Sequence, residues 1–172
     1  MTFSEIVNFH GHSCPGLAMG YRMALAVMAA LGIDRSSDEE VVAVVENDAC
    51  GVDALQCLTG CTFGKGNLVF RDYGKSVYTL WSRTTGRGAR IVFHGREVPA
   101  GLREDRAAYQ DFILTCPESA IISRGEPAGE IPQPARIRDS LVCQKCGEKV
   151  MATRVREQNG LMLCIPCTDG DN

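Results

Sequence analysis

The sequence predicts an α+β core with a mainly antiparallel sheet, followed by a small zinc finger. Three observations lead to this prediction. An apolar segment, Pro15–Leu31, begins with a proline and is followed by a glycine, as is typical of a buried helix. Several β-branched segments come after it without the regular alternation of strand and helix that a parallel sheet needs. Two CxxC pairs, Cys143–Cys146 and Cys164–Cys167, have the spacing of a structural zinc site.

The first helix and the first strand are both expected to be buried. Arg22 is the only strongly charged residue of Pro15–Leu31, and Gly32 can end the helix. The segment VVAVVEN from Val41 is rich in β-branched residues, which is typical of a strand covered on both faces. A buried helix therefore precedes a buried central strand.

The remaining core elements are predicted from local patterns of apolar and turn residues. We expect a helix at Val52–Thr59, strands at Leu68–Phe70, Ser76–Trp81 and Ala89–His94, a helix at Leu102–Leu114, and a short strand at Ala120–Ser123. The three prolines and two glycines among residues 125–135 favour an extended, non-helical chain. The expected division is a core at residues 1–124, a linker at 125–139 and the zinc finger at 140–172.

Composition limits the classes of protein to which the chain can belong. With 172 residues, 45% of them apolar, and a net charge of −3, it can bury one core and a small metal-bound appendage. The longest apolar segment is interrupted by Arg22 and is too short to span a bilayer. No apolar segment of the length of a secretory signal opens the sequence. We therefore expect a cytoplasmic protein in a reducing compartment, with no membrane partner.

The four C-terminal cysteines are expected to bind one structural Zn²⁺ ion. Four thiolates at this spacing can each reach a zinc ion at about 2.3 Å, while the 17 residues between the pairs fold back as a hairpin. Lys149–Arg156 is the predicted first strand, Asn159–Gly160 the turn and Leu161–Cys164 the second strand. Two disulfides or four unrelated thiols are the alternatives. A site filled by four thiolates leaves no open position for water, so this metal would hold a fold or a docking surface.

A second group of candidate ligands precedes the first helix. His10, His12 and Cys14 lie within five residues, and Cys14 occupies the helix N-terminus, where the backbone dipole stabilises a thiolate. The simpler interpretation is a helix-capping cysteine beside two ordinary histidines. Further along, Cys50 and Cys61 flank the expected helix Val52–Thr59 in loops, where functional side chains are frequent. On that helix Asp53 and Gln56 can face a common pocket, whereas Cys57 is expected in the core.

Two long segments, FHGHSCPGLAMGYRMA from Phe9 and CGVDALQCLTGCTFGKGNLVFRDYGKSVYTL from Cys50, resemble the family of the formylmethanofuran dehydrogenase E subunit, and the likeness spans most of residues 5–123. The resemblance implies an α+β core that dimerises and, in some members, a C-terminal treble-clef zinc finger, an alternative to a zinc ribbon for the four cysteines. It also implies association with a molybdenum or tungsten enzyme. The implied site residues are His10, His12, Cys14, Cys50, Asp53, Gln56 and Cys61.

Three classes of function are weighed on these residues. The first is a metal-binding or redox accessory protein, in which His10, His12 and Cys14, with Cys61 and Cys50, bind a second transition metal such as zinc, nickel, iron or copper. Cys14 and Asp53 are then the candidate catalytic residues. The alternative is a non-catalytic assembly module that forms a homodimer and docks on a molybdenum or tungsten oxidoreductase. Nucleic-acid binding is disfavoured, because residues 140–172 carry four basic and four acidic residues and so present no basic surface.

Overall fold

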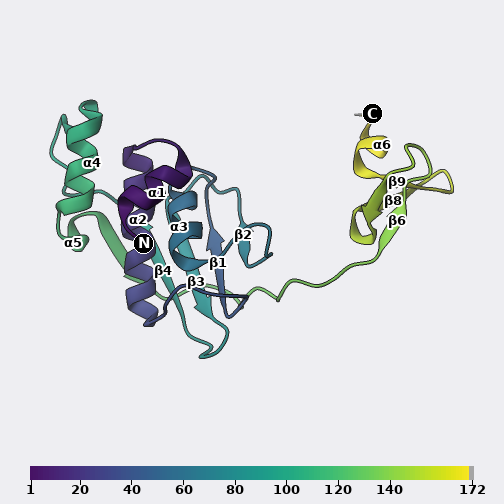
Figure 1. Cartoon of the computed structure of the whole chain (residues 1–172), viewed down its shortest axis with the longest axis horizontal. Helices are drawn as coiled ribbons and strands as arrows, with labels where there is room; N and C mark the ends of the chain where they lie inside the picture. Colours follow the sequence, from purple (N-terminus) through teal and green to yellow (C-terminus); the bar gives the residue numbers. More distant parts are fainter. Residues whose placement is uncertain (171–172) are drawn as a thin grey trace. The chain divides into compact units, whose positions relative to one another are not determined.

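The computed structural model describes residues 1–170 of the chain. The chain divides into two compact units, Met1–Ala135 and the residues from Arg136 onward, which are considered separately (Figure 1). The helices and strands are α1 Phe3–His10, α2 Pro15–Leu31, β1 Val41–Val45, α3 Gly51–Thr59, β2 Leu68–Phe70, β3 Val77–Ser82, β4 Gly88–Phe93, α4 Arg106–Thr115, α5 Glu118–Ile121, β5 Ile122–Gly125, β6 Ser140–Val142, β7 Lys149–Met151, β8 Val155–Gln158, β9 Leu161–Cys164 and α6 Ile165–Asp169, with 3-10 turns η1 Leu102–Glu104 and η2 Ala152–Arg154. The expected domain boundaries at residues 124 and 140 stay a prediction.

A five-stranded sheet forms the centre of the first unit. Its strand order is β2-β1-β3-β4-β5, and the pairs β1–β3, β3–β4 and β4–β5 are antiparallel. This confirms the α+β class with a mainly antiparallel sheet. The exception is β2, which pairs with β1 in parallel after the chain crosses through α3. One β–α–β unit is therefore built into an antiparallel sheet.

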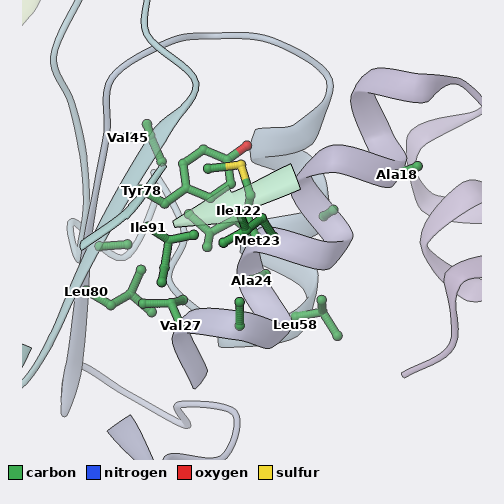
Figure 2. Close-up of a cluster of buried hydrophobic side chains, with 14 of the residues drawn as sticks. Ala18, Met23, Ala24, Val27, Val45, Leu58, Tyr78, Leu80, Ile91 and Ile122 are labelled. Atoms are coloured by element: carbon green, nitrogen blue, oxygen red, sulfur yellow. The ribbon is translucent and has the colours of Figure 1, made fainter. Parts of the chain in front are cut away.

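Helix α2 packs on the sheet at β3 and β4 and also contacts α3 and α4. Figure 2 shows side chains of α2, among them Met23 and Val27, together with Tyr78, Leu80 and Ile91 of the strands. Full burial of one such side chain contributes roughly 1.5–3 kcal/mol. The helix begins and ends at the residues that the sequence predicts, and all five residues of β1 are buried.

Other core elements differ from the sequence prediction at their ends. The helix expected at Leu102–Leu114 is divided, because Asp105 accepts hydrogen bonds from the backbone N–H groups of Ala107 and Ala108, both at 3.0 Å, and so starts α4 after the turn η1. Residues 118–121 form a short helix, and strand β5 follows it at Ile122–Gly125. Helix α1 was not predicted, although Thr2 and Glu5 form a capping box at its start.

Residues 126–135, expected as part of a linker, run along the face of the sheet opposite α2. Ile131 packs with Val42, Val44 and Trp81 in a small second cluster, and the Ala135 N–H donates to Glu39 Oε2 at 2.9 Å. This segment covers apolar surface of the core that would otherwise meet water. No helix within residues 1–170 is both long and apolar enough to cross a lipid bilayer.

The second unit consists of two hairpins and a final helix. Strand β6 pairs with β7, and β8 pairs with β9. The single strand expected at Lys149–Arg156 is thus wrong, because the turn η2 divides it so that its two halves pair with different strands. The turn at Asn159 and Gly160, both with positive φ, is the predicted Asn-Gly turn. Helix α6 begins directly after Cys164, and the whole fits a treble-clef zinc finger.

Candidate functional site

The N-terminus of helix α2 is built as the sequence predicts. Cys14 has an extended backbone, and its Sγ accepts a hydrogen bond from the Leu17 N–H at 3.3 Å. Helix α1 ends at His10, because Gly11 takes the left-handed conformation that favours glycine. The short segment between the two helices therefore holds His10, His12 and Cys14 close together.

A close contact between two helices brings Cys50 to the same place. Cys50 precedes α3, and a Cβ atom built on Gly20 of α2 would lie 2.1 Å from the carbonyl oxygen of Gly51. Only glycine at position 20 permits this approach. Because α2 and α3 touch here, the cysteines that precede them lie side by side.

Four side chains form the resulting core cluster, which we define as His10, His12, Cys14 and Cys50. Their possible ligand atoms all lie within 4.8 Å of one another, a separation from which one metal ion can be bound. The rings of His10 and His12 have centroids 4.4 Å apart. His12 is exposed and Cys14 is buried, so the cluster opens toward solvent on the His12 side.

The His10 ring is oriented by a carboxylate. Its Nδ1 lies 2.7 Å from Asp53 Oδ2, and Asp53 Oδ1 accepts from Gln56 Nε2 at 3.3 Å. A proton shared at Nδ1 leaves the lone pair of Nε2 free. Nε2 is buried and has no hydrogen-bond partner within residues 1–170. A buried imidazole nitrogen without a partner is costly, and it fits a metal ligand.

The two thiols of the core cluster disfavour ionisation of each other. Burial raises the pKa of the Cys50 thiol, and the adjacent Cys14 sulfur raises it further. A bound cation would remove this penalty, since it stabilises both thiolates. The residues present thus fit a transition-metal ion with mixed nitrogen and sulfur ligands.

Cys61 is not part of the core cluster, although the sequence placed it among the ligands. Its thiol is fully buried and lies 3.5 Å from the Val41 carbonyl oxygen, to which it donates. Burial raises its pKa to about 11. Cys57 is buried in the apolar core, in agreement with its predicted role.

The finger cysteines form the second group whose ligand atoms lie within 4.8 Å of one another, namely Cys143, Cys146, Cys164 and Cys167. The Cys164 N–H donates to Cys143 Sγ at 3.3 Å. Hydrogen bonds from the backbone N–H groups of Cys146 and Cys164 lower the pKa of the Cys143 thiol to about 6, whereas burial raises the pKa of Cys167. Four sulfurs so placed can form a zinc site.

A cavity of about 390 Å³ adjoins the core cluster. We call it the cluster cavity; it is lined by His10, Val45, Asn47, Asp48, Ala49, Cys50, Val52, Asp53, Gln56, Phe63, Leu68 and Phe70. The sequence reasoning missed most of these residues. A signal was available in the parallel pairing of β1 and β2, because ligands bind at the carboxyl ends of parallel strands, but an antiparallel sheet was expected there.

Residues 9–123 match the protein family described as "FmdE, Molybdenum formylmethanofuran dehydrogenase operon". The chain is also 31% identical, over 188 aligned residues, to a protein of Archaeoglobus fulgidus named "Probable S-adenosyl-L-methionine-binding protein". That alignment covers 92% of this chain and 50% of the relative, so the chain spans about half the length of this curated relative.

The fold is similar to the crystal structure of an FmdE-like protein from Syntrophus aciditrophicus, of the tungsten formylmethanofuran dehydrogenase type. The TM-score is 0.75 at 22% sequence identity, with 99% of this chain and 94% of the other covered. At this identity the likeness establishes the fold, and the family match independently covers more than half of the chain.

Proposed function

This chain belongs to the FmdE family, and from that premise we propose that its core binds one transition-metal ion through His10, His12, Cys14 and Cys50. One observation above all supports the proposal. The buried Nε2 of His10 lacks a hydrogen-bond partner within residues 1–170, and it belongs to a cluster of four groups that can share one ion. Asp53 is a positioning residue, since it holds the His10 ring through Nδ1.

The donor set narrows the metal without identifying it. Two imidazoles and two thiolates suit zinc, nickel, iron or copper rather than magnesium or calcium. Such an ion, when bound, would supply Lewis acidity or, for iron, nickel and copper, electron transfer. The chain itself would hold the ligands, keep Cys14 shielded from solvent and fix the His10 tautomer.

For the whole protein we propose the role of a metal-binding accessory protein of a molybdenum or tungsten oxidoreductase system. The family description, which refers to a formylmethanofuran dehydrogenase operon, supports this role. Cys14 and Cys50 are the residues that would carry a redox role, and the finger cysteines would hold structural zinc.

A non-catalytic docking module is the second candidate, because the finger exposes apolar side chains. The exposed residues of this kind are Leu141, Val142, Met151, Leu161 and Met162. A solvated finger of this size has no need of them, whereas a surface that docks on a partner protein does. The two candidate functions are separated by whether the core holds metal.

Metal analysis of the full chain, purified without chelator or nickel resin, tests the proposal. We expect two metal equivalents per chain, one for each of the two groups of ligands. His10→Ala and Cys50→Ser should each lose one equivalent, and Cys164→Ser should lose the other. Asp53→Asn should keep the number of bound ions but weaken the affinity of the core by about 10–100-fold, because the ring is no longer held by a carboxylate.

Matched controls come from residues outside the core cluster. His94→Ala removes the third histidine of the chain, which accepts from the Arg96 N–H instead, and Cys61→Ser removes a buried thiol. Both should keep two equivalents. A single equivalent in the parent protein that His10→Ala leaves in place and Cys164→Ser removes would contradict the core metal and favour the docking module.

A further inference from the structure

The cluster cavity lies where the chain can present a small molecule to the core cluster. Val45 and Phe70 end the parallel strands β1 and β2, and both line the cavity. His10 lines it too, and its side chain is only 10% exposed. The carboxyl ends of parallel strands are the usual position of ligands in such folds, and about 390 Å³ is enough for a compact organic molecule.

Aromatic side chains at the opening favour a flat ligand. Phe63 is 75% exposed and Phe70 is 41% exposed, although both line the cavity. Exposed phenylalanines beside a cavity that also contains Val52 and Leu68 offer apolar faces against which a planar ring can stack.

Among the polar lining groups, Asp48 is the one left without a partner. Asn47 donates to the Lys75 carbonyl oxygen at 2.7 Å, while Gln56 contacts Asp53 and accepts from the Phe63 N–H. Asp48 is exposed and makes no hydrogen bond or ion pair within residues 1–170. Its carboxylate can therefore accept hydrogen bonds from a ligand.

The same lining disfavours an anion. No lysine or arginine within residues 1–170 lines the cavity. It does lie at the N-terminus of α3, where an anion would normally be favoured. There, however, the N–H groups of Val52 and Asp53 already donate to the carbonyl oxygens of Ala49 and Cys50, and the Asp53 carboxylate stands in the first turn.

We propose that the cluster cavity binds a flat, neutral or cationic ligand that donates hydrogen bonds to Asp48 and carries no phosphate or carboxylate group. Its ring lies between Phe63 and Phe70, with one edge toward Cys50 and His10. That this ligand meets a metal ion rests on the proposed function, whereas the ligand class rests on the cavity alone.

Calorimetric titration of the full chain with three compounds that share one ring tests the ligand class. Benzamidine is cationic, benzamide is neutral and benzoate is anionic. We expect benzamidine to bind at least about tenfold more tightly than benzoate, with benzamide between them. Asp48→Asn should remove most of the preference for benzamidine over benzamide. Phe63→Ala should weaken both compounds to a similar degree, because it removes stacking and leaves the charge.

Asp72→Asn is the matched control, since Asp72 is also exposed and lines no part of the cluster cavity; it should leave the order unchanged. Benzoate binding as tightly as benzamidine, or no binding of any of the three compounds, would overturn the ligand class. So would a Phe63→Ala variant that binds benzamidine normally but loses self-association, because the phenylalanines would then cover a second copy of the chain. Metal content is measured on the same samples, so the expected order without a core metal would reject only the proposed function.

Discussion

Cys61 illustrates, at the scale of one residue, how burial separates a structural cysteine from a ligand. In the sequence Cys50 and Cys61 are equivalent, one on each side of the same helix. In the structure Cys50 lies beside Cys14, whereas the Cys61 thiol donates to a backbone carbonyl in the core. The difference depends on which way each loop turns, and local sequence does not encode that direction.

The raised pKa of Cys61 predicts a loss of stability at high pH. The unfolded thiol ionises near its ordinary pKa of 9.0, and burial raises the pKa of the folded thiol to about 11. The stabilisation is therefore complete below pH 9 and is lost as the pH rises toward 11. Between about pH 8 and about pH 10.5 the loss should be on the order of 2 kcal/mol.

Urea unfolding of the parent chain and of Cys61→Ala, at both pH values, measures this contribution. The variant should be less stable at the lower pH, because a buried side chain is shortened, yet it should lose less stability on going to the higher pH. Other groups with raised pKa values, such as Tyr78, act equally in both proteins. An identical loss in the two proteins would contradict the burial assigned to Cys61.

Among the elements, those defined by local signals were predictable and those defined by partners were not. Helix α2 has a capping cysteine, a proline in the first turn and a terminal glycine, so both of its ends could be predicted. Strand β2 was placed correctly in the sequence, but its parallel pairing with β1 was not, because pairing depends on residues far apart. The cluster cavity depends on that pairing and was missed with it.

The contact between α2 and α3 predicts an unusual effect of Gly20→Ala. In an exposed helix this change stabilises by up to about 1 kcal/mol. Here the new Cβ would lie 2.1 Å from the Gly51 carbonyl oxygen and 2.2 Å from its Cα, so the helices must separate. Overpacking of this kind costs roughly 1–3 kcal/mol. We expect a net loss of about 1–2 kcal/mol on urea unfolding and a weaker core metal site, since Cys50 moves away from Cys14.

Gly64→Ala is the control for this prediction, because a Cβ there meets no atom within 4 Å. Its stability should change by less than about 0.5 kcal/mol, and its metal affinity, measured by competition with a chelator, should not change. A Gly20→Ala protein that is more stable than the parent would show that the two helices tolerate a wider spacing.

For the whole molecule, the structure changes the reasons for expecting a homodimer. The sequence predicted one because α2 and β1 are so apolar, but Leu17, Met23 and Val27 of α2 are buried within a single chain. The remaining reasons are the family resemblance and the large apolar side chains that the core exposes. These are Phe9, Leu25, Phe63, Phe70 and Tyr73, between 41% and 75% exposed.

We predict that the unit Met1–Ala135 is a dimer by itself. Truncation should follow Ala135 rather than Arg124, because residues 126–135 cover Trp81 and its neighbours and their loss would expose a new apolar surface. Light scattering of residues 1–135 at micromolar concentration should give the mass of two chains, after a cooperative urea transition has shown that the fragment is folded. The full chain is the control and should also be a dimer. A folded fragment that is a monomer beside a dimeric full chain would move the interface to the finger, where exposed Val142 and Met151 would then be the first residues to substitute.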